Sequence, residues 1–145
     1  THRMTSDEYF ASHDETFDLI YIDGDHTHQQ VYKDVENALV VLNRGGIIVM
    51  HDCNPRSAEM EVPEANGTAW RALVKLRERP DIAASTVNFN HGLGLVIPGR
   101  NPKPLDTGKS MDEMTFDDLR KNREVWLNLI RCNWVSRWIA EVERL

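Results

Sequence analysis

The sequence lacks several features that would assign a protein to a class at first sight. Only two cysteines, Cys53 and Cys132, occur among 145 residues, too few for a disulfide framework, so a reducing cytoplasm is the simplest location. No apolar run approaches the length that spans a membrane, and no signal segment opens the chain, so we expect no membrane partner. The formal net charge of −6 argues against nucleic acid as a partner, because phosphate binding needs clustered Lys and Arg.

The rest of the composition is typical of a globular protein. Apolar residues make up 41% of the chain and charged residues 28%, which excludes wholesale disorder. A chain of 145 residues can form one domain with a real core and is too short for two comfortable ones.

Two apolar runs and the segment between them predict a βαβ unit. Residues 17–22 and 47–50 are short and apolar, which is typical of strands buried on both faces. Between them, residues 29–42 carry apolar side chains at helical spacing, and Gly45-Gly46 ends the connection. A crossover of this kind makes the two strands parallel.

The flanking segments predict further elements. Thr5 or Ser6 can cap a short helix that runs roughly to His13. Beyond a loop over residues 52–66, we expect a helix over 68–79 and a hairpin, with strands over 85–90 and 93–97, that turns at His91-Gly92.

We expect three parts: an α/β domain over residues 1–97, a linker over 98–114, and a C-terminal amphipathic helical segment over 115–145. The linker is rich in Pro and Gly. The last segment carries apolar and Trp side chains at helical spacing and forms one long helix or two shorter ones, with Thr115 as a plausible cap.

Polar side chains follow both strands of the βαβ unit. Asp23, Asp25 and His26 follow the first, and His51 and Asp52 follow the second. Ligands bind at the carboxyl ends of strands in open α/β sheets, so these groups lie where chemistry is expected. The alternative is that these side chains cap helices and saturate loop backbone. For any single one of these residues, we favour that alternative. For the group as a whole, we favour a functional role.

The residue types in these groups suggest a metal-assisted reaction. A divalent cation held by Asp23 and Asp52, with His51 or Asn54 beside it, would lower the pKa of a substrate hydroxyl. Asp25 or His26 would then remove the proton, so these two residues are the candidate catalytic bases.

Other residues with chemical potential give weaker signals. We expect His28 to be solvated at a helix start and His91 to have a structural role in its turn. Cys53 has no Cys-His arrangement around it, so a nucleophilic role is not expected. The glycine-rich HGLG lies between two strands instead of before a helix, which makes it a poor phosphate-binding loop.

Three runs carry a resemblance to a known family: TSDEYF, then FDLIYIDGDHTHQQVYKDVENALVVLNRGGIIVMHDCNP, then NGTAWRALVKL. Over roughly residues 4–97 the chain resembles the second half of a class I S-adenosylmethionine-dependent methyltransferase. The nearest branch is the bacterial group with an IDG strand end, often found near sugar or surface-polysaccharide genes. The resemblance implies a partial Rossmann-like sheet, with two parallel strands plus an antiparallel hairpin, flanked by helices.

The resemblance also implies a cofactor and a site. S-adenosylmethionine would be bound with the help of Ser6, Asp7 and Asp23, and the acceptor would be a small-molecule or sugar hydroxyl. The family's glycine-rich loop, and the acidic residue after its second strand, are not found here, so we expect this chain to lack the N-terminal cofactor-binding half. In metal-dependent relatives, carboxylates at the positions of Asp23 and Asp52 bind magnesium; the neighbours His51 and Cys53 depart from the usual Asn or Asp.

These expectations lead to a prediction about assembly and to alternatives. Residues 17–22 would form an edge strand, and unpaired strand edges pair with other chains, so we expect a homodimer or higher oligomer formed along this edge or covered by the C-terminal helices. The main alternative is a non-catalytic methyltransferase-like remnant that serves as an oligomerising or binding module. A metal-dependent hydrolase is a weaker one, because the sequence shows neither a second-metal set nor a nucleophile motif.

Overall fold

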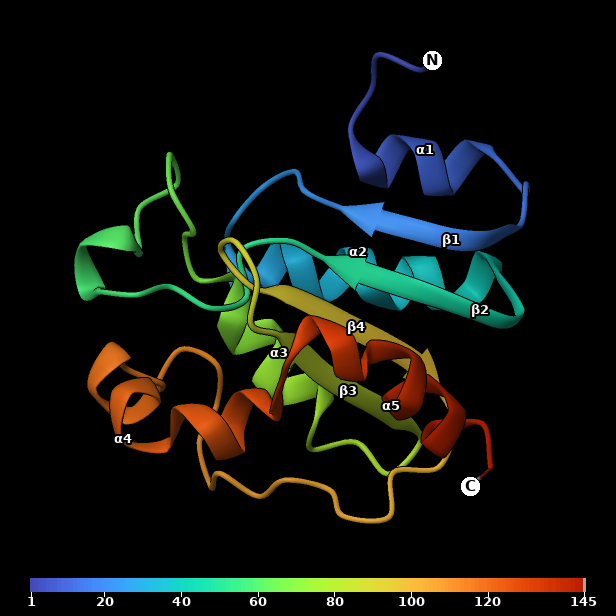
Figure 1. Ribbon diagram of the computed structural model, residues 1–145. Helices are drawn as coiled ribbons and strands as arrows, with labels where there is room; N and C mark the ends of the chain where they lie inside the picture. The colour runs from blue at the N-terminus through green and yellow to red at the C-terminus, as the bar shows by residue number, and fades with distance from the viewer. Residues whose placement is uncertain (145) are drawn as a thin grey trace.

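The computed structural model describes residues 1–144 and shows an α/β fold built on one mixed sheet (Figure 1). Leu145, the last residue of the predicted segment 115–145, lies outside the described residues. The elements in chain order are α1 (Ser6–Ser12), β1 (Phe17–Ile22), α2 (His28–Val41), β2 (Leu42–Met50), the 3-10 turn η1 (Ala58–Met60), α3 (Ala69–Leu76), β3 (Ile82–Val87), β4 (Leu93–Pro98), α4 (Phe116–Leu127), β5 (Leu129–Ile130), the 3-10 turn η2 (Cys132–Trp134) and α5 (Val135–Val142).

The sheet has five strands in the order β1-β2-β4-β3-β5. β1 and β2 are parallel, and β4 pairs antiparallel with both β2 and β3. The predicted parallel pair and antiparallel hairpin are therefore confirmed, and the sheet is that of a partial Rossmann-like methyltransferase fold. The short strand β5, which pairs parallel with β3, was not expected in a segment predicted to be helical. Two residues are too few to show strand periodicity, so only the pairing with β3 defines this strand.

The start of β2 differs from the prediction. The strand begins at Leu42 instead of Ile47, and its register against β1 shifts between the pairs Phe17–Leu42 and Leu19–Ile47. Gly46 allows this irregularity, because a Cβ there would lie 2.9 Å from the carbonyl oxygens of Asn43 and Asp18. The glycine pair therefore forms a bulge inside the strand and does not precede it.

The core lies between the sheet and the helices α2 and α3, which pack against the same face. Ile48 and Met50 of β2 point into this core and are fully buried. The other face is open at β1, where Leu19 is 60% exposed and Tyr21 54% exposed, and it is half-buried at β2, at Ile47 and Val49. The prediction that the two strands are buried on both faces is therefore wrong, because helices cover only one face of this half of the sheet.

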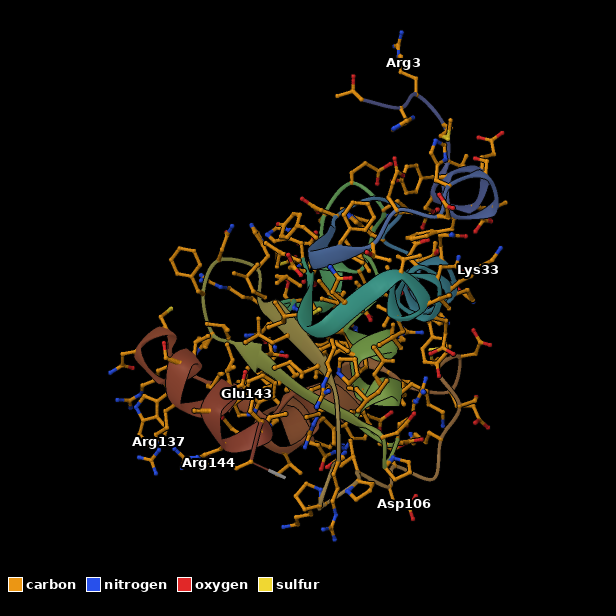
Figure 2. The ribbon with its side chains drawn as sticks, turned by 90° about the vertical axis from the view of Figure 1, so that its right-hand side faces the viewer. Arg3, Lys33, Asp106, Arg137, Glu143 and Arg144 are labelled. Atoms are coloured by element: carbon orange, nitrogen blue, oxygen red, sulfur yellow. The ribbon has the colours of Figure 1, made fainter. Side chains whose placement is uncertain are left out.

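The C-terminal segment forms two helices on different sides of the molecule. α4 lies against α3, where the rings of Trp126 and Trp70 stack with centroids 6.3 Å apart. α5 lies on the face of the sheet opposite α2 and α3, and its Arg137 and the following Arg144 point outward (Figure 2). Neither helix covers the free edge of β1 (Figure 1).

Local sequence signals explain several helix boundaries. Thr5 caps α1 in a reciprocal capping box with Glu8, and Thr115 caps α4 in the same way with Asp118, so both predicted caps are confirmed. Residues 99–114 contain no helix or strand but run along α3, and Leu105 N donates to Arg77 O. None of the helices in residues 1–144 is long and apolar enough to cross a membrane.

Candidate functional site

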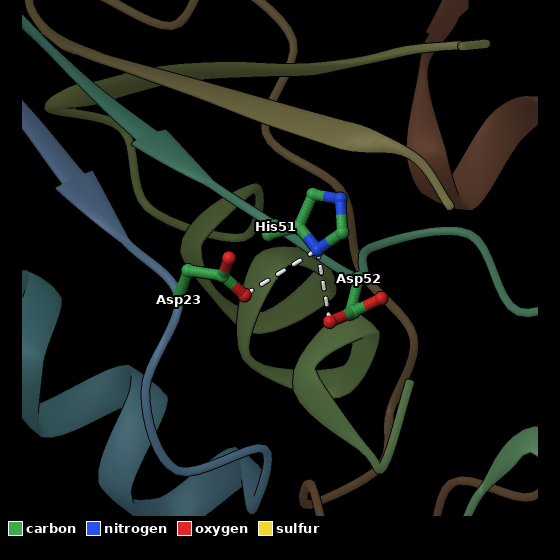
Figure 3. Close-up of side chains that lie close together, drawn as sticks. All are labelled: Asp23, His51 and Asp52. Carbon is green, nitrogen blue, oxygen red and sulfur yellow. Dashed lines mark hydrogen bonds and ion pairs between the residues drawn. The ribbon is translucent and has the colours of Figure 1, made fainter. Parts of the chain in front are cut away.

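The ends of the two parallel strands bring three of the predicted residues into contact (Figure 3). Asp23 directly follows β1, and His51 and Asp52 directly follow β2, while a backbone bond from His51 N to Ile22 O continues the pairing. Nδ1 of His51 lies 3.0 Å from Oδ2 of Asp52 and 3.4 Å from Oδ1 of Asp23. The parallel pairing of the two strands, which the sequence predicts, is what places these side chains together.

His26 joins this group from the loop after β1. Its Nε2 lies 3.3 Å from Oδ2 of Asp52 and 3.7 Å from Oδ1 of Asp23. Its Nδ1 lies 2.9 Å from the carbonyl oxygen of Pro63. A carbonyl oxygen can only accept, so Nδ1 carries a hydrogen and Nε2 is the ring atom available to the two carboxylates. We call Asp23, His26, His51 and Asp52 the strand-end cluster.

The strand-end cluster has the donor atoms of a cation site. Asp23, His51 and Asp52 each offer one ligand atom, and these three atoms lie within 4.8 Å of one another. Carboxylate oxygens suit hard divalent cations, whereas imidazole nitrogen favours transition metals. The mixed set therefore fits a cation such as Mn²⁺ better than it fits Mg²⁺.

Asp52 is held in an unusual backbone conformation. Its φ is 61°, in the left-handed region that non-glycine residues seldom adopt, and it is 5% exposed. Two backbone bonds fasten the chain after it to the hairpin turn: Cys53 N donates to Gly92 O, and Asn54 N donates to His91 O. The turn therefore helps to fix the direction of the Asp52 carboxylate.

Several other predicted residues do not join the cluster. Oδ1 of Asp25 accepts from the backbone N of Thr27, and hydrogen bonds from Thr27 lower the pKa of Asp25, which makes its carboxylate a weaker base than usual. The side chain of Asn54 contacts Arg123 and Asn88. Of the two candidate bases, His26 is the one whose side chain contacts the cluster.

Tyr21 lies beside the cluster on the open face of the sheet. Its ring centroid is 6.3 Å from that of His51. Partial burial, with the nearby charges of Asp23 and Asp52, raises the pKa of Tyr21. The phenol therefore stays protonated near neutral pH and does not compete with His26 as a base.

The residues predicted to bind the cofactor line one open cavity of about 920 Å³ between α1, β1 and α2. Ser6, Asp7 and Asp23 all belong to its lining. Ser6 Oγ donates to the buried carboxylate of Asp34, and Lys33 donates to Asp7, which lowers the pKa of Asp7. Asp23 lines the cavity and also belongs to the strand-end cluster.

His28, His91 and Cys53 have structural surroundings. His28 begins α2 as predicted but is buried, not solvated, because its two ring nitrogens lie 2.9 Å from Thr68 Oγ1 and Asp112 Oδ1. His91 contacts Asn66 in the hairpin turn, which agrees with a structural role. Burial raises the pKa of Cys53 to about 12, so this thiol is a poor nucleophile.

Sequence reasoning missed two contributors to the site. Asp34 lies on the buried stripe of α2 between Val31 and Val35, and an acidic residue in such a stripe is a signal that could have been used. The carbonyl of Pro63 orients His26 from 37 residues away, and no local pattern announces such a contact.

Comparison with known families gives a match to the first part of the chain. Residues 1–53 match the family model of a methyltransferase domain. The match extends from the N-terminal segment through β2 and ends just after Asp52, so it contains the whole strand-end cluster. It supports a methyltransferase-like domain. No curated protein matches the chain.

Proposed function

We propose that this chain provides catalytic residues of an S-adenosylmethionine-dependent O-methyltransferase that acts on a hydroxyl of a small molecule or sugar. The observation that carries the proposal is that Asp23 belongs to two parts of the site. It lines the large cavity and also lies 3.4 Å from His51 in the strand-end cluster. A donor in the cavity and an acceptor at the cluster would therefore meet at this residue.

The cavity suits a cationic nucleoside ligand. A volume of about 920 Å³ is in the usual range for small-molecule sites. Its wall combines apolar side chains such as Phe10 and Ile20 with the carboxylates of Asp23, Asp25 and Asp34. Carboxylates accept from ribose hydroxyls and attract a positive charge, and S-adenosylmethionine would supply a methyl group activated by its sulfonium.

The cluster suits the activation of a hydroxyl. A divalent cation bound by Asp23, His51 and Asp52 would lower the pKa of a coordinated alcohol. His26 would take the hydroxyl proton on Nε2, because Nδ1 already carries the hydrogen donated to Pro63. The imidazolium so formed lies 3.3 Å from the carboxylate of Asp52, which stabilises it. The acceptor oxygen thus exchanges its proton for the methyl group.

Isothermal titration with S-adenosylhomocysteine in the presence of Mn²⁺ tests the proposal. We expect micromolar binding, which corresponds to about −8 kcal/mol, and a clear loss of affinity in Asp23→Asn. Asp117→Asn is the matched control. Asp117 is exposed on α4, and within residues 1–144 its only salt bridge is with Arg120. No heat at millimolar ligand would contradict the cofactor part of the proposal.

We also propose that the protein forms a homo-oligomer through β1. Within residues 1–144 this strand pairs with β2 alone, which leaves its outer edge without a strand partner. The exposed side chains of Leu19 and Tyr21 lie on the open face next to that edge. Strand edges of this kind pair readily with other chains. The same observation supports the alternative of an oligomerising module without catalysis.

A further inference from the structure

We propose that Arg123 of α4 is a positioning residue that holds Asp52 in its productive conformation. The inference rests on the proposed function in one respect, because it takes Asp52 as a ligand or charge partner at the strand-end cluster. It assigns a part in the site to the C-terminal segment, which lies outside the matched residues 1–53.

Arg123 reaches from α4 to the chain immediately after Asp52. Its Nη1 donates to the side-chain oxygen of Asn54 and, over 2.7 Å, to the carbonyl oxygen of Pro55. Its guanidinium also lies over the ring of Phe116, 5.5 Å from the centroid. Arg123 therefore binds two consecutive residues that begin two positions beyond Asp52.

The segment that Arg123 binds is buried and is also held by the hairpin turn. Residues 52–55 are all buried, and the hairpin turn holds them through the backbone of Cys53 and Asn54. The left-handed conformation of Asp52 is strained and persists only where surrounding contacts enforce it. Arg123 supplies the second set of contacts, and without it the buried amide of Asn54 and the carbonyl of Pro55 lose a charged donor.

α4 is fixed well enough to serve as a support. Arg77 of α3 donates to the carbonyl oxygens of Val125 and Trp126 at the end of α4. The stacked rings of Trp126 and Trp70 join the same two helices. These contacts fix the position of Arg123 relative to the core. Arg123 in turn helps to fix the direction of Asp52.

The test compares Arg123→Met with Arg120→Met, each in the full chain. Met keeps much of the apolar contact with Phe116 but cannot donate. Arg120 lies on the same helix, is exposed, and pairs with Asp117, so it controls for loss of one positive charge on α4. The two readouts are the crystal structure of each variant and the binding of Mn²⁺ followed by electron paramagnetic resonance. Urea unfolding of each variant reports its stability.

In Arg123→Met we expect Asp52 to leave the left-handed region and its Oδ2 to separate from Nδ1 of His51. We expect Mn²⁺ binding to weaken about 10- to 100-fold, the usual effect of removing a group that orients a metal ligand. Arg120→Met should match the wild type in both readouts. Arg123→Lys keeps a donating cation and should recover part of the affinity. Arg123→Leu, which also cannot donate, replaces Arg123→Met if that variant does not fold.

The outcomes separate this inference from the proposed function. An unchanged Asp52 conformation in Arg123→Met, or in Arg123→Leu where Arg123→Met does not fold, would overturn the inference whatever the metal data show. So would lowered stability with unaltered Mn²⁺ affinity, since that is the signature of a merely structural residue. Absence of Mn²⁺ binding by the wild type would count against the cation in the proposed function, and the crystal structures would still decide the role of Arg123.

Discussion

The substitution Gly67→Ala is a direct test of how His26 is placed. Gly67 is buried with φ +55°, and a Cβ built on it would lie 2.4 Å from the carbonyl oxygen of His26 and 2.5 Å from its Cβ. The next residue, Thr68, donates its backbone N–H to the same carbonyl over 2.8 Å. Only glycine therefore lets the start of α3 approach the loop that carries His26.

The expected destabilisation has two parts. An L-residue in the left-handed region costs about 1–2 kcal/mol, offset by about 0.4–1 kcal/mol from the reduced entropy of the unfolded chain. Forcing an extra methyl into a packed contact adds about 1–3 kcal/mol. Gly108 is the matched control, because it has φ +64° and nothing within 4 Å of the position that a Cβ would take. Gly108→Ala carries the first part alone, so Gly67→Ala should be less stable than Gly108→Ala by about 1–3 kcal/mol.

Urea unfolding of both variants measures this difference, and the ring ¹⁵N signals of His26 report whether the imidazole has moved. We expect a lower unfolding midpoint in Gly67→Ala than in Gly108→Ala, and shifted His26 signals in Gly67→Ala only. Equal stability of the two variants would refute the close approach, and with it the account of how His26 is held at the cluster.

Three further predictions concern other parts of the molecule. With a pKa of about 12, only about one part in ten thousand of Cys53 is thiolate at pH 8. Iodoacetamide should therefore label exposed Cys132 alone until urea unfolds the chain, and rapid labelling of Cys53 in the native protein would contradict its burial. Thr115→Ala removes the capping box of α4 and should lower the free energy of unfolding by about 1 kcal/mol, and an unchanged urea midpoint would speak against that cap. Leu19→Lys should lower the molecular mass seen by sedimentation, whereas Val40→Lys, also exposed but on α2, should not; the same mass for both would rule out assembly through β1.

The sequence was most informative where structure depends on near neighbours along the chain. The bounds of β1 and the cap of α1 at Thr5 follow from local patterns that survive folding unchanged. The meeting of Asp23 with His51 and Asp52 was also predictable, because a right-handed βαβ unit delivers both strand ends to one edge whatever surrounds it.

Where the prediction failed, contacts between distant segments decided the outcome. The apolar pattern of β1 does not say which face a helix will cover, and the open side of Leu19 follows from the placement of α2 and α3. β5 exists only because β3 lies beside it, and the buried ring of His28 contacts Asp112, 84 residues further along the chain.

The sequence by itself determined the α/β class, the parallel strands and the residue types at their ends, since these depend on periodicity and on the handedness of one crossover. The tertiary structure alone decided which of those residues lie in contact and how each is held. The carbonyl of Pro63 orients His26 from 37 residues away. Arg123 donates to the carbonyl of Pro55, just beyond Asp52, from 68 residues away. Such contacts carry no local signature, because they depend on where the loops and the C-terminal helix pack once the core has formed.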